Sequence, residues 1–243
     1  MNREPIAGNA SNYKIRCRPA NSRWDYCEAF QLVYQRYLSA GLILPNLVGI
    51  RIAPQQLQPG CRVIVAEAAG RFVGTVSLVS GEQSQLPVEH LFPESVASLR
   101  AGGTRLTEIG CLAALDDSGR FPSPVYLALT RAVIHYARQD GVDRLVVAVH
   151  PRHAKFYERA MGFVRLTQEL PYDLVNGQPA VCLAGSPHDA QAYREPWRRH
   201  FFGTYPLAPL AHAGQMSELD CYYFSRLREI IDRDQSALTR RAA

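Results

Sequence analysis

The sequence lacks long apolar runs, and none of its hydrophobic stretches approaches the roughly 20 residues that a membrane-spanning helix needs. Its first residues, MNREPIAGNASNYK, lack the apolar core of a secretory signal peptide. These two absences predict a cytoplasmic protein without a transmembrane segment. The 243 residues are 47% hydrophobic and 20% charged, as is typical of a globular chain that buries a sizeable core.

No two of the six cysteines form a C-x-x-C pair, so the spacing typical of zinc sites and of thioredoxin-like redox centres is missing. Most of them lie among apolar residues, which favours buried free thiols. The sequence therefore predicts no metal site. The cysteines are Cys17, Cys27, Cys61, Cys111, Cys182 and Cys221.

Lysine is nearly absent, since Lys14 and Lys155 are the only two among 27 basic residues. The formal net charge is +5, and the chain lacks the dense basic stripe of nucleic-acid-binding proteins, so we expect no nucleic-acid partner. The mild positive charge suits an acidic partner or an anionic substrate. Arginine, which supplies nearly all of it, makes forked contacts to phosphate and carboxylate.

Neither a G-x-G-x-x-G sequence nor a Walker motif occurs, so the chain is not a Rossmann or P-loop protein. Alternating and helical hydrophobic patterns are present instead. Strands are predicted at 13–18, 62–79 (a hairpin turning at 69–71), 104–115, 145–149, 163–170 and 179–183, the last two joined by a turn at 176–177. Helices are predicted at 22–41, 93–99, 123–141, 151–162 and 217–232.

This order of elements predicts an α/β protein in which helices flank a mixed sheet. Residues 42–59 contain three prolines and are predicted as a loop, with room for one short helical turn. After Gly185 the composition changes to proline and aromatic residues. We therefore predict a main domain over 13–184 and a C-terminal extension over 185–243 that ends in an amphipathic helix.

Several segments, taken together and in order, resemble a known enzyme family. HPRHAKFYERAMGF resembles the final signature of the GNAT N-acyltransferase fold, in which a strand meets a helix that carries a tyrosine before Gly-Phe. AFQLVYQRYLSAGLI, GRFVGTVSLV, LPVEHLFPESVASLR, LTEIGCLA and YDLVNGQPAVCL narrow the resemblance to the long-chain N-acyl amino acid synthases. These are relatives of both GNAT enzymes and acyl-homoserine-lactone synthases.

The resemblance implies a reaction in which a fatty acyl group passes from the phosphopantetheine arm of an acyl carrier protein to the α-amine of an amino acid. The familiar acceptors are aromatic amino acids such as tyrosine, and no cofactor is permanently bound. Contact with a membrane surface through the lipid product is a further expectation. Two alternatives stay open, namely a CoA-dependent N-acetyltransferase and a non-catalytic module that binds acyl groups or the carrier protein.

Amide formation from a thioester requires a base for the amine, donors for the oxyanion and a proton for the leaving thiolate. Glu108 lies in the middle of the predicted strand LTEIGCLA, where the GNAT fold often places a catalytic glutamate, and is the candidate base. The alternative is a glutamate held in a salt bridge on the strand. Tyr157 matches the GNAT tyrosine that protonates the thiolate, although one extra residue before Gly-Phe turns it by roughly 100°. The alternative is a core tyrosine beside Phe156.

His150 ends the buried strand LVVAV and is predicted to share proton transfer or orient the acceptor, or else to cap the next helix. Arg152 is predicted to contact a phosphate or the carboxylate of the acceptor, with an exposed arginine as the alternative. Arg36 and Tyr34 lie where the lactone synthases carry functional arginine and aromatic residues, which implies acceptor binding. The alternative is a helix stripe that belongs to the core.

Backbone amides near Leu112 and Ala113 are the predicted oxyanion donors, if the strand separates there from its neighbour. The loop DDSGRFPSP replaces the glycine-rich loop that cradles the CoA pyrophosphate in CoA-dependent relatives. Its acids, Asp116 and Asp117, would repel a pyrophosphate, whereas Arg120 and the next helix terminus suit the single phosphodiester of a carrier protein. An acidic carrier protein would dock on arginines of the extension, namely Arg194, Arg198, Arg199, Arg226 and Arg228.

Overall fold

The computed structural model describes residues 14–82, 84–115, 121–206 and 215–242. An eight-stranded mixed sheet has the order β1-β2-β3-β4-β5-β8-β6, and β7 pairs with β8 beside this path. All neighbouring strands are antiparallel except β4 and β5, which run parallel. The strands are β1 Arg16–Pro19, β2 Cys61–Ala68, β3 Arg71–Ser80, β4 Leu106–Ala114, β5 Arg144–Val149, β6 Val164–Arg165, β7 Leu170–Tyr172 and β8 Gln178–Gly185.

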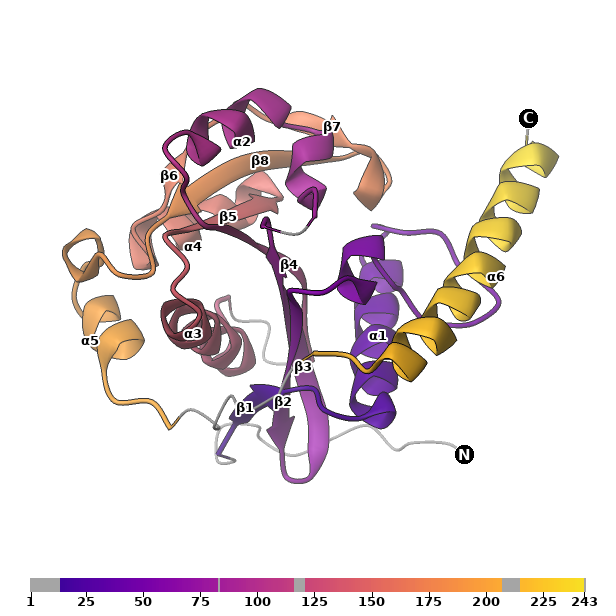
Figure 1. Cartoon of the computed structure of the whole chain (residues 1–243), viewed down its shortest axis with the longest axis horizontal. Coiled ribbons are helices and arrows are strands. Elements are labelled where there is room, and N and C mark those ends of the chain that lie inside the picture. The colour runs from indigo at the N-terminus through magenta and orange to yellow at the C-terminus, as the bar shows by residue number, and fades with distance from the viewer. Residues whose placement is uncertain (1–13, 83, 116–120, 207–214, 243) are drawn as a thin grey trace.

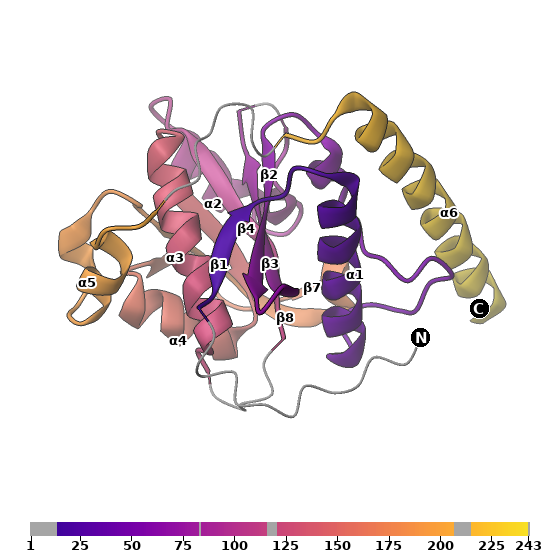
Figure 2. The same cartoon turned by 90° about the horizontal axis from the view of Figure 1, so that it is seen from below.

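Helices cover both faces of the sheet. Figures 1 and 2 show α1 and α6 on one side of β2 to β4, and α3, α4 and α5 on the other. Four short 3-10 turns and six α-helices occur in the described residues. The helices are α1 Arg23–Ser39, α2 Pro93–Arg100, α3 Pro124–Gln139, α4 Pro151–Ala160, α5 Trp197–Phe202 and α6 Glu218–Ala242, and the 3-10 turns are η2 Pro54–Leu57, η3 Pro87–His90, η4 Asp173–Val175 and η5 Ala190–Ala192.

The predicted mixed sheet with flanking helices is confirmed. The strand predicted at 163–170 is wrong in its middle, where the chain leaves the sheet between β6 and β7. There the amide of Cys182 donates to the Thr167 hydroxyl at 3.0 Å, so a side chain takes the place of a backbone acceptor and the ladder stops. The six-residue helix α5 is too short to give a periodic pattern, and α6 continues ten residues beyond the predicted end.

The parallel strands β4 and β5 pair only at their beginnings, from Leu106–Arg144 to Glu108–Val146. Beyond that point β4 stays with β3, whereas β5 continues with β8 as far as Val149. The two strands therefore separate in the middle of the sheet. In their second halves, β4 and β5 therefore do not pair with each other.

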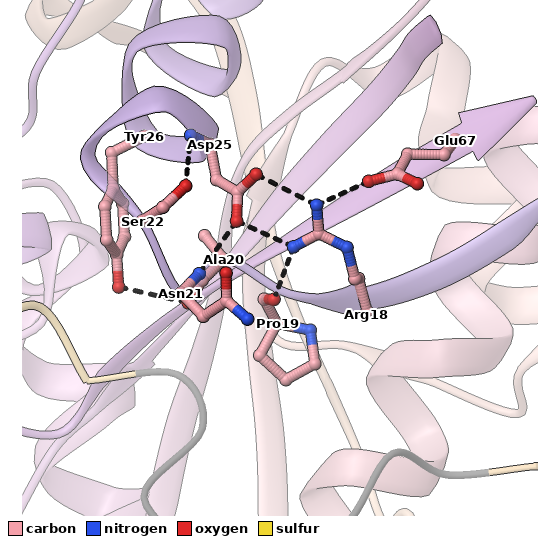
Figure 3. Close-up of polar contacts among 8 residues, drawn as sticks. All are labelled: Arg18, Pro19, Ala20, Asn21, Ser22, Asp25, Tyr26 and Glu67. Carbon is pink, nitrogen blue, oxygen red and sulfur yellow. Dashed lines mark hydrogen bonds and ion pairs between the residues drawn. The ribbon is translucent and has the colours of Figure 1, made fainter. Parts of the chain in front are cut away.

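A network of polar side chains holds the beginning of α1 against the sheet (Figure 3). Arg18 of β1 donates to both carboxylate oxygens of Asp25 at 2.7 and 2.9 Å, and also to Glu67 of β2 at 2.5 Å. Asp25 further accepts from the amide of Asn21 at 2.9 Å, and Ser22 caps the helix. Because α1 is a rigid element, this anchor also positions its last turn.

The C-terminal segment shares hydrophobic clusters with the rest of the fold. Phe224 of α6 is fully buried and packs edge-on against Phe30 of α1, with ring centroids 5.1 Å apart. Tyr193 and Phe201 join the cluster between the sheet and α3. The division of the chain at residue 185 stays a prediction. None of the helices in the described residues has the length and apolar composition that crossing a bilayer requires.

Candidate active site

A cavity of about 470 Å³ lies where β4 and β5 separate. Tyr37 of α1 and Arg51, whose guanidinium lies over the Tyr37 ring, line the cavity, as do Tyr126 of α3 and Tyr157 of α4. Figure 1 shows α1 on one face of the sheet and α3 and α4 on the other. Because side chains from both faces contribute, the cavity passes through the sheet between the two strands. Its volume lies in the range of about 300–1,000 Å³ that is usual for small-molecule sites.

Glu108 lies in the wall of this cavity at the last paired position of β4 and β5. Its side chain is buried, and its carboxylate accepts a hydrogen bond from the amide of Val88 in η3 at 2.8 Å. Burial is the main cause that raises the pKa of Glu108; the Val88 amide lowers it, the nearby Glu89 raises it, and together they give a pKa of about 8. No salt bridge of Glu108 occurs among the described residues, so the strand salt bridge considered above is not formed there.

The backbone of β4 is irregular just past Glu108. Thr75 pairs with Ala113 and Ser77 with Gly110, so Cys111 and Leu112 together oppose one residue of β3 in a β-bulge. Cys111 has a left-handed φ of 47°, which is uncommon for a residue other than glycine. Both bulge residues line the cavity, whereas Ala113 is back in the ladder with β3 and does not.

Tyr157 is at once a core residue and a wall residue of the cavity. It is buried, and its ring packs against those of Phe156 and Phe163. Its hydroxyl accepts a hydrogen bond from the Tyr126 hydroxyl at 2.9 Å. Burial raises the pKa of Tyr157 to about 12, so the phenol keeps its proton at neutral pH. The extra residue before Gly162 does not turn Tyr157 away from the cavity.

His150 and Arg152 both line the cavity at the beginning of α4. Nδ1 of His150 accepts from the amide of Arg152 at 3.1 Å, which is the predicted capping role. Burial and the charge of Arg152 lower the pKa of His150, so its imidazole is neutral at neutral pH. Arg152 is exposed, and its Nε donates to Nε2 of His153 at 3.0 Å.

The other predicted residues lie elsewhere. Arg36 is exposed on α1 and does not line the cavity. Tyr34 also lies outside the cavity. Its hydroxyl donates to the carbonyl of Asn46 and accepts from the amide of Asn46, and Asn46 does line the cavity. Asp116, Asp117 and Arg120 fall outside the described residues.

The arginines predicted to dock a carrier protein do not form one surface. Those at 194–199 lie at α5 and those at 226–228 on α6, and Figures 1 and 2 show these helices on opposite sides of the molecule. Arg198 pairs with Glu195 at 3.0 Å, and Arg228 pairs with Asp232 at 3.2 Å. These five arginines form two separate groups because the two ends of the extension pack on opposite faces of the sheet.

Several cavity residues carry no signal in the sequence. Arg51 lies in the proline-containing loop between α1 and η2, where no periodic pattern indicates which side chains point inward. Gln56 is buried, donates to the Ser77 hydroxyl at 2.8 Å and also lines the wall. Within the described part of the chain, no three His, Cys, Asp or Glu side chains are gathered as metal ligands.

Comparisons with known proteins agree with this architecture. The family described as N-acyl amino acid synthase FeeM matches residues 28–186. No curated protein sequence matches the chain. The structure of FeeM, an N-acyl amino acid synthase from uncultured soil microbes, is similar with a TM-score of 0.65 and 20% identity, over 75% of this chain and 96% of FeeM.

Two acyl-homoserine-lactone synthases have the same fold. LasI has a TM-score of 0.60 and 15% identity, over 82% of this chain and 98% of LasI. MesI, described as CoA-dependent, has a TM-score of 0.57 and 18% identity, over 79% of this chain and 99% of MesI. At these identities the structural likeness establishes the fold, and the family match extends over 28–186.

Proposed function

Because the chain belongs to the N-acyl amino acid synthase FeeM family and is an acyltransferase, we propose that it moves a long-chain fatty acyl group from acyl carrier protein to an amino acid. The acyl group leaves the sulfur of the phosphopantetheine arm and joins the α-amine of the acceptor. The observation that carries this proposal is the cavity through the sheet, with the buried carboxyl of Glu108 in its wall.

In this proposal the two substrates meet from opposite faces of the sheet. The pantetheine arm enters between β4 and β5 from the side of α3 and α4, where the N-terminus of α3 offers a positive dipole end to its phosphate. The amino acid enters from the side of α1 and the loop before η2. The thioester then lies at the point where the strands separate, beside Glu108.

Glu108 accepts a proton from the ammonium form of the acceptor. Its raised pKa matches this task, because a base with a pKa near the working pH combines sufficient basicity with a usable ionised fraction. The freed amine attacks the thioester carbonyl, a C–N bond forms and the C–S bond breaks. Tyr157 is the proposed donor of the proton that the departing thiolate takes up, and its phenolate regains a proton as the attacking nitrogen releases its second one.

The oxyanion of the tetrahedral intermediate needs hydrogen-bond donors that are in place before the reaction. The bulge at Cys111 and Leu112 supplies candidate backbone amides, since neither residue has its own partner in the β3 register and β5 has already separated. His150, neutral and fixed by its capping bond, orients groups at the cavity rim. We propose no catalytic part for Ala113, Tyr34 or Arg36.

The test of the proposed function is product identification with several donors. Purified chain is offered palmitoyl–acyl carrier protein, palmitoyl-CoA or acetyl-CoA with each amino acid, and products are identified by mass spectrometry. The proposal expects N-palmitoyl amino acids, formed fastest from the carrier-protein donor. Preferred use of acetyl-CoA would support a CoA-dependent N-acetyltransferase instead. An absence of acyl amides with every donor would support a non-catalytic binding module.

A further inference from the structure

Arg51 projects from the loop between α1 and η2 and is fixed on the cavity wall by contacts on both sides. Its backbone amide donates to the carbonyl of Phe30 at 3.1 Å. Its guanidinium lies over the ring of Tyr37, 5.3 Å from the centroid, and its Nη2 donates to the carbonyl of Leu174 at 3.1 Å. Both Tyr37 and Leu174 also line the cavity, so the guanidinium is held at its surface.

The charge of Arg51 has no acidic partner among the described residues. Its side chain makes the one hydrogen bond to Leu174 within that part of the chain, and its Nε is buried without a partner. The arginine that α6 contributes to the cavity differs, because Arg228 pairs with Asp232 at 3.2 Å. A partly buried cation that lacks a counter-ion is costly, and an anionic ligand would compensate it.

Glu108 does not provide that compensation, although it belongs to the same cavity. Burial raises its pKa to about 8, so at pH 7 the carboxyl is mostly neutral. Burial also raises the pKa values of Tyr37, Tyr172 and Cys111. The charge of Arg51 opposes this rise at all three residues, whereas Glu108 adds to it in its ionised form. Arg51 and Glu108 therefore act on the same three groups from within one site.

We infer that Arg51 binds the α-carboxylate of the acceptor, which directs the acceptor's α-amine to Glu108. The inference rests on the proposed function and assigns the acceptor class as α-amino acids with a free carboxylate. Guanidinium forms paired, charge-assisted hydrogen bonds with carboxylate. The ammonium group of one amino acid then meets Glu108 on β4, while the carboxylate of the same molecule binds Arg51 in the loop before η2. Arg51 thus takes the acceptor-binding role that the resemblance implied for Arg36 and the carboxylate contact that was predicted for Arg152.

The test compares the best amino acid acceptor with its primary amide and with the corresponding decarboxylated amine, at saturating acyl donor. Wild type is expected to prefer the amino acid over both analogues by about 10- to 100-fold in kcat/KM, the range of a charged hydrogen bond at about 1.4 kcal/mol per tenfold. In Arg51→Gln, KM for the amino acid rises by that factor, the analogues are unaffected, and the preference disappears. Arg51→Lys keeps the positive charge but cannot form the paired hydrogen bonds of a guanidinium. Its preference for the amino acid is expected to lie between those of wild type and Arg51→Gln.

Three further variants make the comparison specific. Arg71→Gln replaces an exposed arginine at the β2–β3 turn, outside the cavity, and is expected to retain the wild-type preference. Arg36→Gln and Arg152→Gln test the rival carboxylate sites. The inference is overturned if Arg51→Gln keeps the preference, or if either rival variant abolishes it in place of Arg51→Gln. Thermal unfolding shows whether each variant is folded, and Arg51→Lys is used if Arg51→Gln is not.

A binding measurement separates this inference from the proposed function. Calorimetric titration of the carrier-free protein with the amino acid and with its amide requires no acyl transfer. Binding of the amino acid by wild type, weakened at least tenfold in Arg51→Gln and absent for the amide, supports the inference even if no acyl amide is formed. Equal binding of amino acid and amide contradicts it even if transfer occurs. Failure of wild type to bind any amino acid also contradicts it.

Discussion

At the scale of single residues, the burial of Glu108 makes the native state favour its protonated form. Its pKa of about 8 in the folded chain exceeds the ordinary value of 4.5, so the folded state binds this proton more tightly than the unfolded state. The contribution to stability is therefore complete below about pH 4.5 and is lost as the pH rises through about 8. A shift of this size corresponds to a few kcal/mol, at about 1.4 kcal/mol per pH unit.

We predict from this that Glu108→Gln, which keeps an acceptor for the Val88 amide and cannot ionise, gains stability relative to wild type between pH 4.5 and 8. Chemical denaturation at pH 5, 7 and 9 measures the difference in free energy of unfolding. It is expected to increase by a few kcal/mol in favour of the variant across this range. A difference that is constant with pH would show that the Glu108 pKa is not raised.

Glu108 could be recognised from sequence because a carboxylate in the middle of an apolar strand is unusual and the resemblance supplied a role. Arg51 could not be recognised in the same way. Its loop, LPNLVGIRIAP, has no regular hydrophobic period, and its position depends on packing against Tyr37 and Leu174. Arg36 lies on a clear helical pattern, yet its side chain is exposed and does not line the cavity.

At the scale of elements, the anchor at the beginning of α1 connects stability to the site, because the last turn of this helix carries Tyr37. Burial would raise the pKa of Asp25, but the hydrogen bonds and charge of Arg18 outweigh this effect and lower it. The stabilisation from this pair is therefore present above about pH 4 and is lost as the pH falls through the lower pKa of the folded chain.

We predict that Asp25→Asn reduces the free energy of unfolding by about 2–4 kcal/mol at pH 7. The loss is smaller than for a buried ion pair without other partners, because Arg18 still pairs with Glu67 in the variant. The difference from wild type shrinks below about pH 4. The matched control Glu195→Gln breaks an exposed pair with Arg198 and is expected to cost less than about 1 kcal/mol. Equal losses in the two variants would contradict the anchoring role.

Elements with a strong local signal could be predicted, and those that depend on distant partners could not. The β2–β3 hairpin turns at Ala69 and Gly70, which both have positive φ, as its sequence indicates. The end of β6 depends on the Thr167 hydroxyl meeting the amide of Cys182, a contact between separate segments. The separation of β4 from β5 likewise depends on which neighbour each strand keeps, and no residue pattern encodes that.

At the scale of the whole molecule, the sheet separates two arginine groups that the sequence presents as one extension. The group at α5 lies on the side of α3, where His200 of α5 contacts the carbonyl of Leu127 in the first turn of that helix at 3.4 Å. The proposed pantetheine entrance is on this side. The group on α6 lies on the acceptor side (Figure 2).

We predict that reversing both Arg198 and Arg199 to glutamate raises KM for acyl carrier protein several-fold at low salt and leaves kcat unchanged, because rim charges mainly affect association. High salt is expected to remove the difference by screening. A soluble acyl-pantetheine donor and the α6 variant Arg226→Glu serve as controls that show no change. A larger effect of Arg226→Glu would contradict donor entry on the α5 side.

In the proposed reaction, Glu108 accepts the acceptor's proton inside a cavity that crosses the sheet. The pH dependence of kcat/KM for wild type and Glu108→Gln tests it most directly, because the acceptor's own ammonium titrates identically with both proteins. We predict that wild type gains activity as the pH rises through about 8, and that Glu108→Gln lacks this inflection and is slower by about 10²–10⁴-fold. A Glu108→Gln variant with the wild-type rate and the wild-type inflection would show that Glu108 is not the base.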